Sequence, residues 1–183
     1  GLMEVKPAYA RWDKFNATTE VGLWAGSLLR AADYANSDEF VELAAAGLRA
    51  FLEQAWDPER RRYYGRVQVA TGEPTLGEKS SEYQPSDYSE LWEPLFPAHD
   101  YPFQCAEAAY ALFKRTGEET FRTACDRWIE VIGKALPARD GRGGYAEHYG
   151  RCIHFLNHAA ADFPAAGPLV EQSVDEAVET LWA

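Results

Sequence analysis

Apolar residues recur along much of the chain with the 3.6-residue period of amphipathic helices. The pattern predicts a first helix over residues 17–35 and a second over residues 38–56, with Ser37 as the N-cap of the second. The second helix carries a stripe of residues expected to be buried: Phe40, Ala44, Gly47, Leu48, Phe51 and Ala55. The chain is therefore expected to open with an antiparallel helix pair.

Two further helix pairs are predicted, over residues 101–115 with 118–136 and over residues 145–162 with 169–182. A tight turn at Thr116 and Gly117 joins the first of these pairs. The apolar stripes are Phe121, Cys125, Trp128, Ile129 and Ile132 in the earlier pair and Val170, Val174, Ala177, Val178 and Leu181 in the last helix. Three similar pairs form an internal repeat, and the predicted fold class is all-α.

The link after the first pair is long and rich in aromatic residues. Residues 63–70 alternate like a short strand and residues 71–74 form a turn, so a small β-hairpin is expected there. The remainder carries Tyr83, Tyr88, Trp92 and Phe96 among acidic residues. A loop this long in a compact domain is usually functional or disordered, and its many aromatic residues argue against disorder.

Composition fits one soluble domain over residues 1–183, with 46% hydrophobic and 26% charged residues. The net charge of −11 makes nucleic acid an improbable partner, because such a surface repels phosphates. No apolar run approaches the roughly 18 residues of a membrane span, so no membrane partner is expected. The start lacks the pattern of a signal peptide, and a cytoplasmic location is slightly favoured. Cys105, Cys125 and Cys152 fall in apolar helical stretches and are expected to be buried thiols.

Two segments resemble the (α/α) toroid, or six-hairpin, carbohydrate-active enzymes. Residues 108–121, AAYALFKRTGEETF, are similar to the hairpin turn of that superfamily, and residues 56–64, WDPERRRYY, resemble its helix-to-strand connection. The superfamily includes N-acylglucosamine 2-epimerase-like proteins, glycoside hydrolases and polysaccharide lyases. The resemblance implies that the helical hairpins form part of a toroid. Such proteins close a ring of hairpins, of which this chain supplies three.

The resemblance also implies that the first helix of each pair lines the lumen, where the ligand lies. On the helix predicted over residues 145–162, the helical wheel places four polar residues on one stripe: Glu147, Arg151, His154 and His158. The helix predicted over residues 101–115 has a matching stripe. When the two helices are aligned, Asp100 corresponds to Glu147, Gln104 to Arg151 and Glu107 to His154. The alternative is a solvated face on which Glu147 and Arg151 form an ordinary i,i+4 pair.

Carboxylates and imidazoles in a wet lumen suit proton transfer on a sugar, as in epimerisation, β-elimination or hydrolysis. The candidate catalytic residues are His154, Glu107, Glu147 and His158, and we expect His154 to approach Glu107 across the lumen. The candidate substrate-binding residues are Tyr83, Tyr88, Trp92, His99, Asp100, Gln104, Tyr110, His148 and Arg151. Trp92 is expected to be partly exposed beside the polar stripes; the alternative is that Trp92 and Phe96 pin the long loop to the core.

No cofactor and no metal are expected. His154 and His158 have i,i+4 spacing but could bind a metal only with ligands from elsewhere, and no H-E-x-x-H motif or cysteine cluster accompanies them. The predicted function is a carbohydrate-processing domain, an epimerase, lyase or hydrolase, with a sugar or oligosaccharide as partner. The alternative is a non-catalytic helical-repeat interaction or scaffold domain. Three hairpins leave a ring open, so we expect a homo-oligomer or a part of a longer protein.

Overall fold

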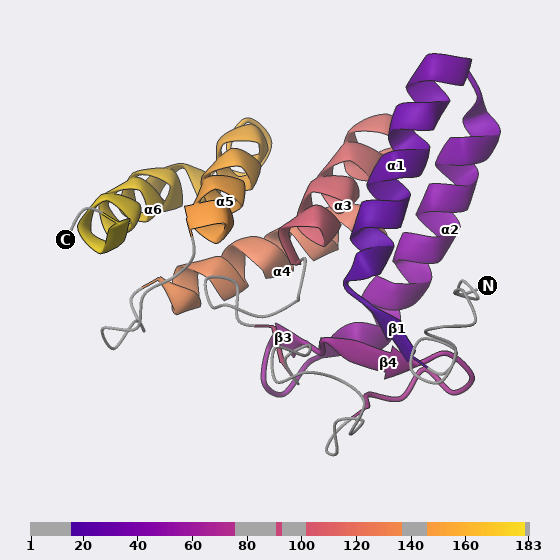
Figure 1. Ribbon diagram of the computed structural model, residues 1–183, viewed down its shortest axis with the longest axis horizontal. Coiled ribbons are helices and arrows are strands. Elements are labelled where there is room, and N and C mark those ends of the chain that lie inside the picture. The colour runs from indigo at the N-terminus through magenta and orange to yellow at the C-terminus, as the bar shows by residue number, and fades with distance from the viewer. Residues whose placement is uncertain (1–15, 76–90, 93–101, 137–145, 182–183) are drawn as a thin grey trace. The chain divides into compact units, whose positions relative to one another are not determined.

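The computed structural model describes residues 16–75, 91–92, 102–136 and 146–181, and most of these residues are helical (Figure 1). The chain divides into two compact units. Unit 1 consists of residues 1–92 and 98–108, and unit 2 of residues 93–97 and 109–183, with the boundary inside helix α3 (Pro102–Thr116). The predicted mostly helical class with a small β-hairpin is confirmed.

An antiparallel helix pair, α1 (Glu20–Ala35) and α2 (Asp38–Ala55), is the main element of unit 1 (Figure 1). Asn36 ends α1 in the left-handed conformation with φ of 50°, and its backbone N–H donates to the carbonyl of Ala32. The facing sides of the pair are apolar and buried, with Ala25, Leu29, Ala32, Ala44, Leu48, Phe51 and Leu52 in the core. The helix pair was predicted correctly, although α1 begins at Glu20 rather than at residue 17.

Short strands lie next to the start of α1 and the end of α2 in the sequence. Strand β1 (Asn16–Thr18) precedes α1 and pairs antiparallel with β4 (Arg66–Gln68). Strands β2 (Trp56–Asp57) and β3 (Arg62–Tyr63) form the small hairpin that directly follows α2. A hairpin was predicted in this link, but with its turn at residues 71–74, whereas the observed hairpin turns between Asp57 and Arg62. The pairing of β4 with a segment before α1 was not predicted.

Trp92 lies in the core of unit 1. Its side chain is 0% exposed, and its ring centroid lies 4.8 Å from that of Tyr63 and 5.9 Å from that of Phe51. Its backbone N–H donates to the Tyr63 carbonyl at 2.8 Å, and Arg62 Nη1 donates to the Trp92 carbonyl at 3.2 Å. The expectation that Trp92 is partly exposed is therefore wrong, because the ring completes the apolar contact between α2 and β3.

The first half of α3 packs closely on α1 within unit 1. A Cβ atom added to Gly22 would lie 2.6 Å from the carbonyl carbon of Gln104 and 2.7 Å from the Cα of Cys105. The thiol of Cys105 donates to the carbonyl of Thr19 across the same contact, at 3.2 Å. Glycine at position 22 thus permits the close backbone approach of the two helices.

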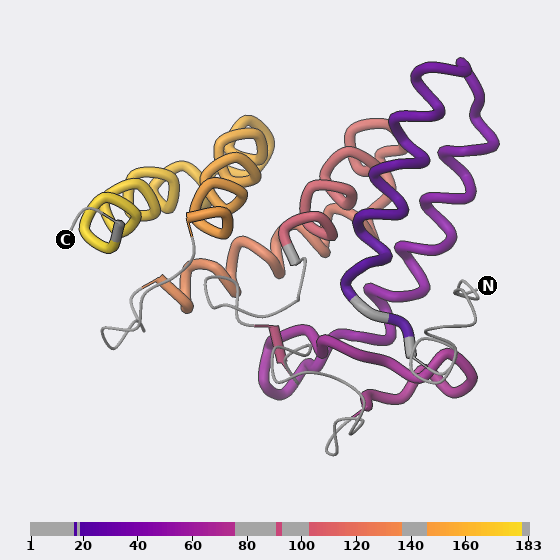
Figure 2. The backbone as a smooth tube through the Cα atoms, in the orientation of Figure 1, coloured from indigo at the N-terminus to yellow at the C-terminus, as the bar shows by residue number. Residues whose placement is uncertain are grey.

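Unit 2 contains the second half of α3 and the helices α4 (Glu119–Ala135), α5 (Ala146–Ala159) and α6 (Ala166–Leu181). Gly117, with φ of 69°, forms the predicted turn between α3 and α4. The backbone of the helices is traced in Figure 2. All five predicted stripe residues of α4 are buried: Phe121, Cys125, Trp128, Ile129 and Ile132. Helix α5 packs along α6, and both contact α4.

The end of unit 2 differs in detail from the prediction. Helix α6 begins at Ala166 instead of residue 169, and the predicted stripe residues Val174 and Val178 are 41% and 51% exposed. Between α5 and α6, the Sγ of Cys152 lies 3.6 Å from the Oγ of the fully buried Ser173.

The three cysteines are buried thiols, as predicted, and none of them forms a disulfide. Burial raises the pKa of the Cys125 and Cys152 thiols to about 12. Both thiols are therefore protonated at neutral pH and are poor nucleophiles.

No helix within the described ranges combines the length and the apolar character needed to cross a membrane. The closure of the helix pairs into a toroid, and the oligomer expected to complete it, stay predictions.

Candidate functional site

A cleft of about 460 Å³ lies in unit 1 where the C-terminal end of α2 meets the β2–β3 hairpin and the turn that follows β4. We call it the Asp57 cleft. Its lining is Gln54, Trp56, Asp57, Pro58, Glu59, Tyr64, Thr71, Gly72, Glu73 and Pro74. The set combines two aromatic rings with three carboxylates and one amide. Its volume falls within the range of about 300–1,000 Å³ that is typical of small-ligand sites.

The turn after β4 depends on Gly72, which has φ of 74°. The Gly72 N–H donates to the Gln68 carbonyl at 2.8 Å, and the Gln68 N–H donates to the Glu73 carbonyl at 2.7 Å. A Cβ atom on Gly72 would lie 2.8 Å from the Cδ of Gln54. Glycine thus allows both the left-handed turn and the approach of Gln54 from α2, which together form one wall of the cleft.

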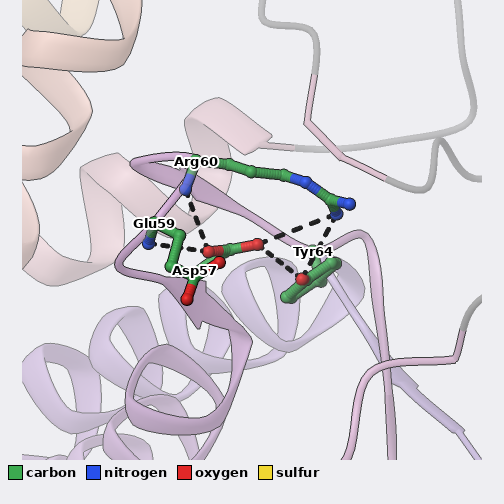
Figure 3. A network of polar contacts seen from close by, with 4 residues as sticks. All are labelled: Asp57, Glu59, Arg60 and Tyr64. Carbon is green, nitrogen blue, oxygen red and sulfur yellow. Dashed lines mark hydrogen bonds and ion pairs between the residues drawn. The ribbon is translucent and has the colours of Figure 1, made fainter.

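Asp57 organises the opposite wall (Figure 3). Its Oδ1 accepts the backbone N–H groups of Glu59 at 2.9 Å and Arg60 at 3.0 Å. Its Oδ2 accepts the hydroxyl of Tyr64 at 2.5 Å and lies 3.7 Å from Arg60 Nη1. Arg60 Nη1 also donates to the Tyr64 hydroxyl oxygen at 3.4 Å. The Asp57 side chain is nine-tenths buried, so these contacts fix its orientation.

These contacts set the charge of the cleft. The hydrogen bond from Tyr64 lowers the pKa of Asp57 below its ordinary value, and the backbone N–H groups of Arg60 and Glu59 and the Arg60 charge act in the same direction. Asp57 is therefore ionised at neutral pH and accepts hydrogen bonds. Glu59 and Glu73 are exposed, so their carboxylates can reach a ligand from solvent.

Asp57 also has a structural role. Its Oδ1 contacts close the turn between β2 and β3, in which Arg61 adopts a left-handed conformation with φ of 51°. The carboxylate thus positions Glu59, Arg60 and Tyr64 at the cleft as well as lining it.

The candidate site residues predicted from the sequence lie partly outside the described residues and partly in each of the two units. Tyr83, Tyr88, His99 and Asp100 lie outside the described residues. Trp92 and Gln104 are buried in unit 1, at 0% and 7% exposure, and Trp92 is not part of the Asp57 cleft. Glu107 is half-buried and belongs to unit 1, whereas His154 belongs to unit 2, and their approach stays a prediction.

The polar stripe predicted on α5 lies in unit 2, and its four residues form two contacting pairs. The rings of His154 and His158 have centroids 4.2 Å apart, and both side chains are exposed. Arg151 Nε donates to Glu147 Oε1 at 3.1 Å, as in the alternative of an ordinary i,i+4 pair. His148 is half-buried on the same helix.

Tyr110, predicted to bind substrate, is in contact with charged residues of unit 2. Its hydroxyl donates to Asp162 Oδ2 at 2.7 Å, and Lys114 Nζ contacts both Asp162 oxygens at 2.9 and 3.0 Å. Desolvation and the Asp162 carboxylate raise the pKa of Tyr110 to about 12. The hydrogen bonds from Lys114 and Tyr110 lower the pKa of Asp162. This cluster ties α3 to the turn between α5 and α6.

The Asp162 cluster predicts a pH dependence of stability. A carboxyl group whose pKa is lower in the folded state stabilises the fold above its unfolded pKa, and this contribution is lost as pH falls through the folded pKa. Asp162→Asn should therefore lower the melting temperature at neutral pH, and the difference from the wild type should shrink between about pH 5 and pH 2. Thermal unfolding across this range measures the effect. Asp175→Asn, at an exposed position of α6, is the control, and an equal response of both variants would contradict the assignment.

The Asp57 cleft was not predicted from the sequence, although the segment that supplies several of its side chains resembles a known family. Residues 56–64 were noted for their resemblance to a helix-to-strand connection, and they supply Trp56, Asp57, Glu59 and Tyr64. The remaining wall comes from the turn at 71–74, which was predicted as a turn without a functional role. The sequence feature that could have indicated the cleft is an acidic and aromatic segment at residues 56–64, followed after β4 by a Gly-Glu-Pro turn.

Comparisons with known proteins do not assign a family. No protein family, no curated protein and no solved structure matches this chain.

Proposed function

We propose that this chain is a carbohydrate-binding domain of a carbohydrate-processing enzyme, and that the Asp57 cleft holds the sugar. The observation that carries the proposal is the composition of the cleft, in which Trp56 and Tyr64 lie beside the carboxylates of Asp57, Glu59 and Glu73. Aromatic rings provide apolar area for the faces of a sugar ring. Carboxylates accept hydrogen bonds from its hydroxyl groups, and such bonds are stronger than those between neutral groups.

The charge of the cleft favours a neutral sugar. Three carboxylates and one arginine, Arg60, surround it or lie beside it, and the whole chain carries a net charge of −11. A uronic acid or a phosphorylated sugar would be repelled by this field. The expected ligand class is therefore an uncharged mono- or oligosaccharide.

We propose further that the bound sugar undergoes a reaction on this protein. At neutral pH, Asp57 is a hydrogen-bond acceptor, so an epimerase or a hydrolase would need a proton donor from another residue. A polysaccharide lyase eliminates at a uronic acid, so it fits a neutral ligand less well than these two. His154, Glu107, Glu147 and His158 remain the proposed catalytic residues. They would act together with the Asp57 cleft only if a complete toroid brings them to one lumen.

Binding can be tested by isothermal titration calorimetry with neutral hexasaccharides of glucose, mannose, xylose and N-acetylglucosamine. We expect one of these to bind, and the double variant Glu59→Gln with Glu73→Gln to weaken binding by about tenfold or more, because two charged acceptors are lost. Both residues are exposed, so the melting temperature should change little.

The matched control is Glu171→Gln with Glu179→Gln, which removes the same charge from exposed positions of α6. Equal affinities of the two double variants would contradict the assignment of the cleft. If none of the hexasaccharides binds the wild-type protein, the non-catalytic interaction or scaffold domain becomes the better account.

A further inference from the structure

We infer that His154 and His158 on α5 form a chelating site for a divalent transition-metal ion such as Zn²⁺ or Cu²⁺. The inference does not depend on the Asp57 cleft, which lies in unit 1, whereas both histidines lie in unit 2. It gives His154 and His158 the role of metal ligands in place of the proton transfer proposed above.

His154 and His158 lie side by side on one face of α5. Residues four apart on a helix are neighbours on one face, and the two rings are in contact with centroids 4.2 Å apart and planes inclined by 59°. Two nitrogen ligands at about 2.0–2.1 Å from a tetrahedral ion lie roughly 3.3 Å apart. Imidazole rings that share a tetrahedral ion have centroids about 5 Å apart, so the two rings must turn apart by about 1 Å, through rotation of their side-chain bonds, to bind it.

The surroundings of the pair allow an ion to enter. Both side chains are exposed, so an ion reaches them from solvent and water completes its coordination. The nearest cation in sequence, Arg151, is held by Glu147 at 3.1 Å, which offsets its charge. The net charge of −11 attracts cations to the surface in general.

The ligand set selects the metal class. Imidazole suits Zn²⁺, Cu²⁺ and Ni²⁺, whereas Mg²⁺ and Ca²⁺ require oxygen ligands. Asp162, one turn after His158, is occupied by Lys114 and Tyr110. In the described part of the chain no group of three or more histidine, cysteine or acidic residues could hold a metal. The site therefore has two protein ligands and open positions, the arrangement in which a metal can also accept a further ligand.

The test is calorimetric titration of tag-free protein with ZnCl₂ and with CuCl₂ in a non-chelating buffer. We expect one ion per chain, and His154→Ala and His158→Ala should each weaken binding on the order of 100-fold, because the second ligand of a chelate acts at high effective concentration. His148→Ala, on the same helix, is the control and should bind like the wild type. A dissociation constant above about 1 mM for both metals would overturn the inference.

Electron paramagnetic resonance of the Cu²⁺ complex provides a second readout. The site predicts superhyperfine splitting from two nitrogen ligands in the wild type and from one in either single variant. Splitting from a single nitrogen in the wild type, or an unchanged spectrum in both variants, would show that the two histidines do not share an ion.

Discussion

Trp92→Ala is expected to lower the free energy of unfolding by about 3–5 kcal/mol, the usual loss for a buried tryptophan. The ring is fully buried against Phe51 and Tyr63, so its removal leaves a cavity where the long link meets the core of unit 1. The backbone hydrogen bonds of residue 92 to Tyr63 and Arg62 would remain, together with the bridge between Leu91 and Tyr64. Urea denaturation measures the change.

Trp92→Phe is the matched control for this cavity. Phenylalanine keeps an aromatic ring at the contact and should lose less than half of the stability lost with alanine. A loss below about 1 kcal/mol for Trp92→Ala would mean that the ring contributes little to the core. A large loss of sugar affinity in the folded Trp92→Phe protein would instead favour the earlier expectation that Trp92 binds the ligand.

Gly22→Ala is expected to lower the free energy of unfolding by about 3 kcal/mol, at the upper end of the usual cost of overpacking. The added methyl group would meet the backbone of Gln104 and Cys105 in α3, and backbone atoms cannot move aside as a flexible side chain can. The two helices must separate to accept it. Thermal and urea unfolding of the variant measure the loss.

Gly26→Ala, one turn along the same helix, controls for helix propensity. A Cβ atom there would meet only Arg30 Nη1, at the ordinary contact distance of 3.6 Å. This variant should gain about 0.5–1 kcal/mol, because alanine is the better helix former. If both variants respond with the same sign, the close approach of α1 and α3 is not the cause of the effect at Gly22.

Local periodicity was sufficient to predict the helices of the described residues. The buried stripes of α2 and α4 repeat every three to four residues, and Gly117 marks the turn between α3 and α4. Helix ends were less well predicted. Residues 17 and 18 fit a helical pattern but pair instead with Val67 and Arg66, because an available strand edge satisfies their backbone groups.

Contacts between distant segments could not be predicted from the sequence. Trp92 was assigned to a loop because it lies among acidic residues in a long link, yet its burial depends on Phe51 and Tyr63. Likewise, the Asp57 cleft forms only when the turn at Gly72 approaches Gln54 at the end of α2. Neither contact produces a periodic pattern in the sequence, because each brings together residues that are far apart along the chain.

The helical wheel predicted the shared face of His154 and His158 correctly, because both residues belong to one helix. It could not decide whether His154 approaches Glu107, because that distance depends on how two separate helices are placed.

The central claim is that a neutral oligosaccharide binds in the Asp57 cleft. The most direct measurement is a nuclear magnetic resonance titration of ¹⁵N-labelled protein with the four neutral hexasaccharides. With at least one of them, we expect the largest chemical-shift changes at the backbone amides of Glu59, Tyr64, Gly72 and Glu73, which line the cleft. Shifts confined to α6, or no shift with any of the four, would contradict it.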